Sequence, residues 1–414
     1  MSLSNADQLK RNYFWNTMGS LMSSFSSVLL LVVVTRELGA YVAGIFSLAY
    51  ALGQQFQTLG QFEMRPYQVT DVKNRYSFAT YLGSRYLTCT AMIACLLVYS
   101  IATNGFGEDA ALLLMVASLK LFDAFEDVFH GLLQQRGRLD LAGRAFFFRV
   151  LITTVSFVVG VVVCKDLMHA TLIAILASLV SMLLLNVPQT LKFETLVPSF
   201  SWRHIVGLLL ACLPLFLSSF LLNDIVNVPR YGIEGVLSKD SQTIYSILYM
   251  PALVINMLVG FLFKPLLTNF AEYWELGQRS KFFGLVRKGM VLTFLVSAIS
   301  AVVAWLFGIP VLSWFYAVDL SAYRFELMTV MLGGLFNALG VILYYALVTM
   351  RLQKLVVVGY ALSAGVAHLV VTPLINTFNI MGAFVTYDLS TALLVVIFAI
   401  EIVLSMKFLK GGNA

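Results

Sequence analysis

Charged residues are scarce in this chain of 414 residues: they make up 12% of it, whereas hydrophobic residues make up 60%. A soluble domain carries roughly 25% charged residues, which keep its surface compatible with water. The mean hydropathy of +0.87 agrees with this shortage of charge. The composition therefore excludes a set of soluble domains and predicts an all-α polytopic membrane protein.

Signatures of soluble enzymes are also missing. There is no glycine-rich phosphate loop of the G-x-x-x-x-G-K-[ST] type, so we expect no ATP hydrolysis by this chain. The segments between the apolar stretches are too short to hold a catalytic domain. We expect no enzymatic activity, no catalytic residues and no cofactor.

Cysteine is rare and shows no pairing pattern. All four cysteines lie inside apolar stretches, and we interpret them as small buried residues without a disulfide or a metal; they are Cys89, Cys95, Cys164 and Cys212. The N-terminal residues lack the basic, apolar and cleavage-site pattern of a removed signal peptide. We therefore expect the first apolar span to remain in the mature protein.

Twelve apolar segments are long enough to cross a hydrocarbon core of about 30 Å. They lie at 13–35, 39–62, 79–101, 110–133, 142–164, 168–189, 204–228, 241–264, 285–308, 326–349, 355–376 and 381–406. Basic residues outside the spans concentrate on one side, at positions such as Arg11, Arg136 and Arg279, and the other side holds few, such as Arg230. This bias predicts that both termini are cytoplasmic.

The two halves of the chain contain a weak repeat. AGIFSLAY at 43–50 aligns with QTIYSILY at 242–249. We therefore predict two parallel six-helix lobes, 1–190 and 204–414, with a cytoplasmic linker at 191–203 between them. A duplication of this kind favours a transporter with a central cavity between the lobes.

Polar residues gather on one side of the fourth predicted span. At 100° per residue they share an arc of about 120°; they are Lys120, Asp123, Glu126, Asp127, His130 and Gln134. Ionisable side chains inside a span are costly and usually face a cavity or a partner. The stripe predicts a water-filled cavity with Lys120, Asp123, Asp127 and His130 as substrate-binding residues. The alternative is a helix end that emerges early into solvent, with Lys120 and Asp123 simply paired.

Three arginines lie within or at the edge of neighbouring spans: Arg85 in the third, and Arg144 and Arg149 in the fifth. A guanidinium group binds phosphate oxygens through two parallel hydrogen bonds and stays ionised at low dielectric. We include all three among the substrate-binding residues. The alternative is that their side chains snorkel to lipid headgroups, which is the interpretation we prefer for Arg65.

The C-terminal half offers three candidates for ion coupling: Asp224 in the seventh span, His368 in the eleventh and Asp388 in the twelfth. Acidic groups at depth in a membrane often bind protons or cations in coupled transporters. The same residues could instead form interhelical hydrogen bonds that stabilise the bundle. The sequence leaves both interpretations open.

The N-terminal stretch KRNYFWNTMGSLMSSFSSVLLLVVVTRELGAYVAGIFSLAY resembles the opening of the oligosaccharide and polysaccharide flippases. The resemblance lies in Asn12, Asn16, Arg36, Leu38 and Gly39, with Gly44 in the next turn. That family belongs to the multidrug, oligosaccharidyl-lipid and polysaccharide exporter superfamily. Twelve spans in two halves fit it over essentially the whole chain.

The resemblance implies a function as well as a fold. Members of the flippase branch move undecaprenyl-diphosphate-linked oligosaccharides, such as capsule repeat units, across the cytoplasmic membrane by alternating access. It also implies partners, namely glycosyltransferases that build the unit and a polymerase that extends it, and none that are nucleic acids.

Two other functions remain as alternatives. A cation-coupled multidrug exporter of the same superfamily would depend on Asp123 and Asp388 and be indifferent to Arg85 and Arg149. A membrane-embedded glycosyl or phosphoglycosyl transferase would need soluble loops, which are short here.

Overall fold

The computed structural model describes residues 5–71, 75–263 and 267–411, and these are helical without a strand. Ten helices in this part are long and apolar enough to cross a membrane. The fourth predicted span is absent from these ten because its polar stripe exceeds the charge that such a span normally carries. The first two spans together form one continuous but kinked helix. The predicted all-α membrane fold is therefore confirmed.

Helix α1, Asn5–Gln61, folds back on itself at Gly39. The backbone there has φ 86° and ψ 170°, a conformation essentially restricted to glycine. Ser27 and Tyr50, almost equally far from Gly39 on either side, bring their hydroxyl groups to 3.2 Å from each other. The two arms of α1 are thus antiparallel neighbours, as expected of two successive spans.

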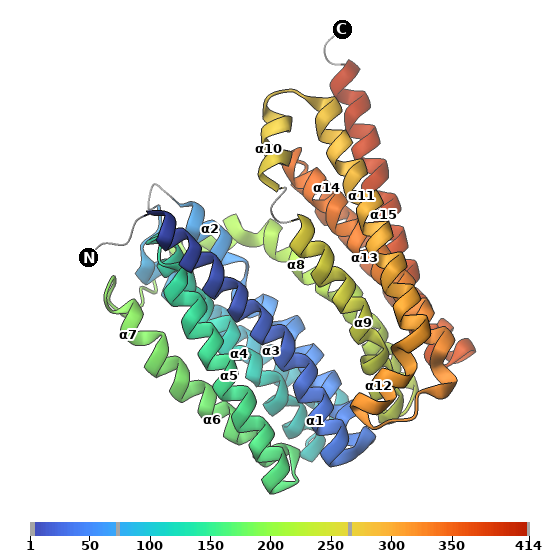
Figure 1. Cartoon of the computed structure of the whole chain (residues 1–414). Helices are drawn as coiled ribbons and strands as arrows, with labels where there is room; N and C mark the ends of the chain where they lie inside the picture. Colours follow the sequence, from blue (N-terminus) through green and yellow to red (C-terminus); the bar gives the residue numbers. More distant parts are fainter. Residues whose placement is uncertain (1–4, 72–74, 264–266, 412–414) are drawn as a thin grey trace. The chain divides into compact units, whose positions relative to one another are not determined.

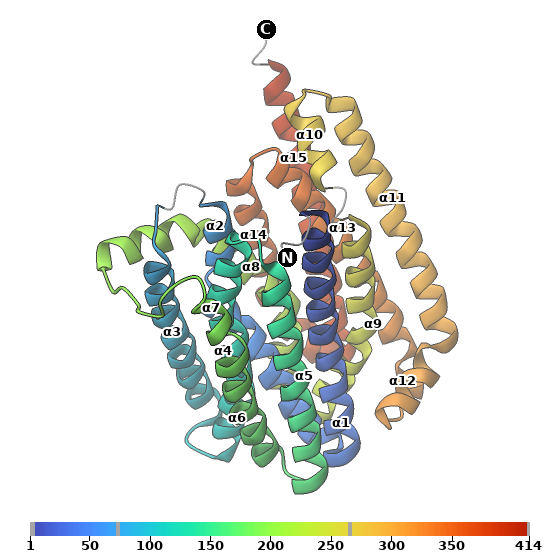
Figure 2. The same cartoon turned by 60° about the vertical axis from the view of Figure 1, so that its left-hand side comes forward.

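Contacts between helices divide the chain into two compact units, Met1–Phe220 and Leu221–Ala414. In the first unit, α1 packs with four long helices that run side by side in Figures 1 and 2. They are α3 (Phe78–Asn104), α4 (Glu108–Gln135), α5 (Leu139–Cys164) and α6 (Leu167–Leu185). The short helices α2 (Met64–Thr70) and α7 (Val187–Thr190) complete this unit.

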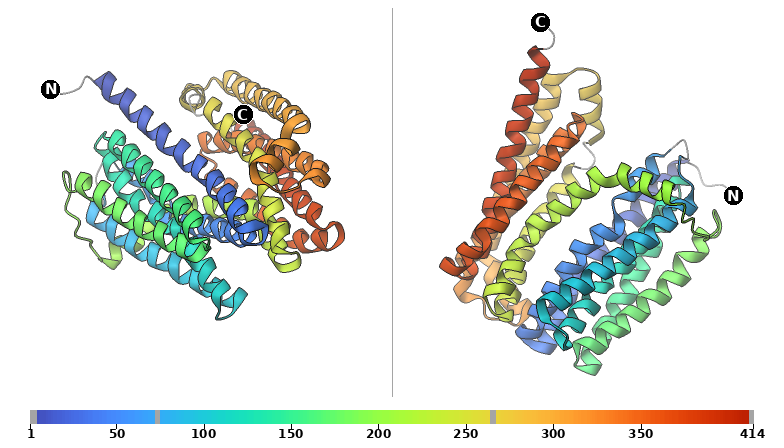
Figure 3. Two further views of the ribbon diagram at one scale, coloured as in Figure 1. Left: turned by 60° about the horizontal axis from the view of Figure 1, so that its bottom comes forward. Right: turned by 180° about the vertical axis from the view of Figure 1, so that it is seen from behind.

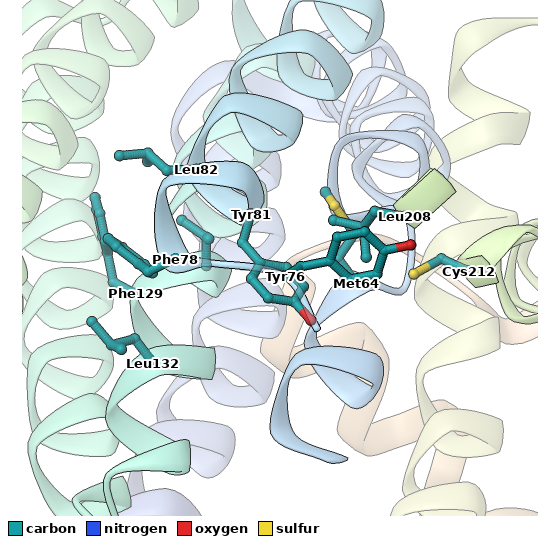
Figure 4. Packing of buried hydrophobic residues seen from close by; sticks show 10 residues of the cluster. Met64, Tyr76, Phe78, Tyr81, Leu82, Phe129, Leu132, Leu208 and Cys212 are labelled. Atoms are coloured by element: carbon teal, nitrogen blue, oxygen red, sulfur yellow. The ribbon is translucent and has the colours of Figure 1, made fainter. Parts of the chain in front are cut away.

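Helix α8, Trp202–Val236, contains the boundary between the units. Its first half belongs to the first unit because Leu208 and Cys212 join a buried hydrophobic cluster with residues of α2, α3 and α4. Figure 4 shows this cluster, in which Met64 and Tyr81 are both 1% exposed. Contacts therefore extend the first unit to Phe220, beyond the linker predicted at 191–203, and the division into lobes at that linker stays a prediction.

The second unit continues from α8 into α9 (Lys239–Phe263), α10 (Leu267–Glu275) and α11 (Arg279–Val303). A π-helical turn leads to α12 (Ile309–Tyr316), and α13 (Arg324–Thr349), α14 (Gln353–Phe378) and α15 (Ile380–Gly411) follow. Helix α15 packs against both α13 and α14, and Figure 3 shows it, in red, beside these orange helices.

Two details differ from the sequence-based expectations. Helix α8 continues eight residues past the predicted span end at 228, so Arg230 lies inside this helix and is 7% exposed. The external position expected for Arg230 stays a prediction. Cys95 and Cys164 are exposed rather than buried, whereas Cys89 and Cys212 are buried. Their side chains are small enough to lie on an apolar outer face.

We predict that Gly39→Ala lowers the thermal unfolding midpoint of the protein in detergent. No atom lies within 4 Å of a Cβ added there, so the cost is backbone strain alone, on the order of 1–3 kcal/mol. Gly284→Ala, in α11, is the control because it also meets no atom and has ordinary helical geometry. Equal midpoints for the two variants would show that the conformation at Gly39 does not require glycine.

Candidate functional site

A cavity of about 310 Å³ opens within the first unit, between the two arms of α1 and helices α4 and α5. Most of its lining is polar. The lining residues are Asn16, Ser20, Ser23, Ser24, Ser27, Gln54, Gln57, Gln61, Arg65, Lys120, Asp123, Glu126, Asp127, His130, Leu139, Ala142, Gly143 and Phe146. A second pocket of about 30 Å³ lies behind Lys120 and Asp123, which is room for a single water molecule.

The two arms of α1 contribute uncharged hydrogen-bonding groups. On the first arm, Ser20, Ser24 and Ser27 each donate a hydrogen bond to the carbonyl oxygen four residues earlier. Their hydroxyl protons are thereby engaged, and their oxygen lone pairs remain as acceptors. On the second arm, three glutamines add amide donors and acceptors. The cavity therefore offers many neutral polar contacts along one wall.

The opposite wall is the polar stripe of α4, held by a buried network around Arg149 of α5. The guanidinium donates from Nε to Glu126 Oε2 at 2.8 Å and from Nη2 to Glu126 Oε1 at 2.6 Å. Nη2 also binds Asp123, whose other oxygen accepts from Lys120 Nζ at 2.9 Å. Arg149 is 2% exposed and Glu126 1%. This network connects α4 to α5.

A second branch of the network reaches the end of α6. Asn186 donates from Nδ2 to Glu126 Oε2 at 3.0 Å, and its Oδ1 lies 3.1 Å from His130 Nε2. Phe146 of α5 packs edge-on against the His130 ring. Asn186 is 0% exposed, so it fixes both Glu126 and His130 from behind the cavity wall.

Asp127 is the centre of a separate arginine cluster. Arg85 donates from Nη2 to Asp127 Oδ2 at 2.9 Å and from Nη1 to the Gly60 carbonyl oxygen at 2.6 Å. Arg65 of α2 approaches the other Asp127 oxygen at 3.4 Å and binds Gln134 Oε1 at 2.9 Å. The Arg65 side chain is 29% exposed and the Arg85 side chain 1%. Arg65 therefore faces the cavity, and Arg85 stands behind Asp127.

The structure brings most of the predicted substrate-binding residues together. Lys120, Asp123, Asp127 and His130 line the cavity, and all but Asp123 are less than a tenth exposed. The stripe of α4 is thus not a helix end emerging into solvent.

The three predicted arginines occupy different places. Arg85 and Arg149 do not snorkel: they are buried and paired with carboxylates behind the cavity wall. Arg144 is exposed and lies over the rings of Trp15 and Phe148, outside the cavity lining.

The candidates for ion coupling all lie in the second unit. His368 Nε2 of α14 is 2.9 Å from Asp224 Oδ2 of α8. Asp388 of α15 is 8% exposed and lies against Gly333 of α13. It has no described contact with Asp224 or His368. Their role in coupling stays a prediction.

Reasoning from the sequence missed the polar face of α1 and the contact of Arg65 with Asp127 at the cavity. The signals were present: Asn16, Ser20, Ser23, Ser24 and Ser27 recur with helical spacing, and so do Gln54, Gln57 and Gln61. Serine and glutamine also form interhelical contacts in membrane helices, so this spacing alone does not indicate a cavity.

We predict that Arg149→Met lowers the free energy of unfolding, measured by denaturant titration in mixed micelles, by about 3–5 kcal/mol. Removing one partner of a buried ion pair leaves the other charge uncompensated. Adding Glu126→Gln should recover part of the loss. The matched control is Arg144→Met. Arg144 is an exposed residue of the same helix and forms no ion pair among the described residues. Similar stability of both single variants would contradict the buried network.

Comparisons with known proteins show what the fold resembles. No protein-family model and no curated sequence matches the chain. Among solved structures, an inward-facing multidrug resistance MATE family transporter of the MOP superfamily matches with a TM-score of 0.72 and 13% identity over 96% of both chains. The lipid II flippase MurJ in an inward closed conformation matches with a TM-score of 0.71 and 12% identity, over 93% of this chain and 87% of MurJ.

These two neighbours are named as a transporter and a flippase. At such low identity the likeness concerns the fold. The chain therefore shares the fold of these MATE transporter and MurJ flippase structures.

Proposed function

We propose that this protein is a flippase that moves a lipid-linked oligosaccharide, such as a capsule repeat unit on undecaprenyl diphosphate, from the cytoplasmic to the outer leaflet. The observation that carries the proposal is the lining of the first-unit cavity. Hydroxyl and amide groups cover α1, and basic groups stand beside them at Arg65 and Lys120. A sugar diphosphate presents hydroxyl groups, which can pair with the hydroxyl and amide groups, and anionic phosphate oxygens, which can pair with the basic groups.

The neutral wall suits sugar hydroxyl groups. Pockets for drug-like ligands are lined mainly by hydrophobic and aromatic side chains. This cavity has one aromatic lining residue, Phe146, and one large aliphatic residue, Leu139. The serine oxygens of α1 accept hydrogen bonds, and the glutamine amides both donate and accept them. Such a surface loses polar solvation if an apolar molecule fills it.

The charged wall suits a diphosphate. Arg65 and Lys120 line the cavity and are held by Asp127 and Asp123 at 3.4 Å and 2.9 Å. A diphosphate that enters would take over these donors, because charge-assisted hydrogen bonds to phosphate oxygens are strong and directional. Arg85 and Arg149 would then balance the released carboxylates from behind.

The mechanism requires no covalent step. The headgroup binds in the polar cavity, the prenyl chain stays in lipid, and the protein exposes the cavity to each side of the membrane in turn. The chain would act in the cytoplasmic membrane with both termini in the cytoplasm. Glycosyltransferases would supply its substrate and a polymerase would consume the product. The lipid II flippase among the structural neighbours supports a lipid-linked substrate.

A multidrug exporter is the second candidate, and one observation favours it. Three carboxylates, those of Asp123, Glu126 and Asp127, lie at the cavity, and carboxylates would attract a cationic drug. The MATE transporter with a TM-score of 0.72 shares this fold. The two candidates differ in which charges they need: a flippase depends on the basic groups and an exporter on the acidic ones.

Mass spectrometry of the undecaprenyl-linked pool, with and without the gene in the native host, tests the proposal. We expect a complete and unpolymerised unit to accumulate on the cytoplasmic leaflet when the gene is deleted. An unchanged pool together with new drug sensitivity would favour the exporter instead. A truncated unit would indicate a missing transferase step.

We further predict that Lys120→Gln causes accumulation of this unit, whereas Lys192→Gln does not. Lys120 lines the cavity, while Lys192 is exposed and binds only Gln189 in the described contacts. Both variants remove one charge, and protein levels in the membrane must match. Equal effects of the two variants on the lipid pool would contradict a role of Lys120 in binding the diphosphate.

A further inference from the structure

The charged groups at the first-unit cavity do not cancel. One connected set of ion pairs joins four basic side chains to three carboxylates. The basic residues are Arg65, Arg85, Lys120 and Arg149. The acidic residues are Asp123, Glu126 and Asp127. Counted over these described residues, with His130 neutral, the site has one positive charge in excess.

A prenyl diphosphate sugar brings two negative charges to this site, because each phosphate of a diphosphate that is esterified at both ends keeps one ionised oxygen. The cavity with such a ligand would then hold one negative charge in excess. A buried charge without a partner is costly. The ligand of best fit therefore carries one positive charge of its own.

One branch of the network stays balanced when a diphosphate binds. Asp127 is paired with both Arg65 and Arg85. If Arg65 turns to a phosphate, Arg85 remains 2.9 Å from Asp127 and neutralises it. The charge deficit does not arise at this carboxylate.

The other branch becomes unbalanced. Arg149 is shared by Asp123 and Glu126, and Lys120 supplies the second cation at 2.9 Å from Asp123. If Lys120 turns to a phosphate, Arg149 alone faces two carboxylates. The Asp123 side chain is 12% exposed and that of Glu126 is 1% exposed. Asp123 is therefore the carboxylate that a cation of the ligand can reach.

The facing wall of the cavity is rich in hydrogen-bond acceptors. Ser20, Ser24 and Ser27 use their hydroxyl protons on backbone carbonyl oxygens and keep oxygen lone pairs to offer. An ammonium group has three donors and no acceptor. The Nζ atom of Lys120, 2.9 Å from Asp123, already shows that an ammonium group fits beside this carboxylate. A carboxylate on one wall and hydroxyl oxygens on the other thus suit a protonated amine.

The size of the cavity indicates which part of the ligand carries the amine. Its volume of about 310 Å³ is at the small end of ligand pockets, which span about 300–1,000 Å³. Such a volume suits the diphosphate and the sugar attached to it rather than a whole oligosaccharide. The amine therefore belongs to that first sugar.

We propose that the headgroup bound by this cavity is zwitterionic: a diphosphate attached to a sugar that carries a free, protonated amino group, with Asp123 as the residue that selects it. The inference rests on the proposed flippase function and names the substrate class of its cavity. An N-acetylated sugar lacks the required charge. An acidic sugar adds a further negative charge beside Asp123 and is disfavoured more strongly.

Binding of two defined ligands to the purified full-length protein in detergent tests this selection. Both are short-chain prenyl diphosphate hexosamines, one with a free amine and one N-acetylated, and calorimetric titration in mildly acidic buffer keeps the amine protonated. We expect the wild type to bind the amine about tenfold more tightly, because a buried carboxylate is then paired. Equal affinity, or tighter binding of the N-acetylated ligand, would overturn the proposal.

Asp123→Asn tests the role of the selecting residue. It removes one negative charge from the cavity, which then matches the two charges of the N-acetylated ligand, so the preference should reverse. Glu194→Gln is the control, because Glu194 pairs with Arg136 outside the cavity lining, and it should keep the wild-type preference. A preference for the amine that persists in folded Asp123→Asn would overturn the assignment of Asp123.

Further outcomes separate this inference from the flippase function. Tighter binding of the N-acetylated prenyl monophosphate than of the amino diphosphate would show that one phosphate matches the site, and it would overturn the amine. Binding of ethidium but of neither diphosphate lipid would reject the flippase function itself. The unit that accumulates in the deletion strain should carry a free amine on its first sugar. Accumulation of a unit without this amine would support the flippase and contradict the inference.

Discussion

The buried ion pairs of Arg149 with Glu126 and Asp123 are the constraint on which the first unit depends. Charges inside a protein interior are stable only when they are fully paired and hydrogen-bonded. The polar stripe of α4 can therefore exist inside a membrane unit only because α5 supplies a guanidinium and Asn186 supplies an amide. The same contacts that neutralise the stripe also fix its side chains around the cavity.

The backbone of α1 provides the facing wall. Its reversal at Gly39 places two polar faces, one rich in serine and one in glutamine, against the charged stripe. The result is a cavity with neutral groups on one side and ion-paired groups on the other. The arginines behind the wall and the basic residues that face the cavity are different. Arg85 and Arg149 pair with carboxylates, whereas Arg65 and Lys120 line the cavity.

Hydropathy and the helical periodicity of α4 were enough to predict the membrane fold and much of the charged wall. The periodicity of a helix places Lys120, Asp123, Asp127 and His130 on one face without any tertiary information. Partners could not be predicted in this way, because the pairing of Arg85 with Asp127 joins residues 42 positions apart. The burial of Arg230 was missed because α8 continues past its most apolar segment.

In the proposed flippase the sugar diphosphate binds in the first-unit cavity, and site-specific photocrosslinking in cells tests this most directly. A photoreactive amino acid at Gln57, which lines the cavity, should capture a prenyl diphosphate sugar that mass spectrometry identifies. The same amino acid at Leu191, which is exposed and lies outside the cavity lining, should not. Capture at Leu191 but not at Gln57, at equal protein levels, would contradict the account.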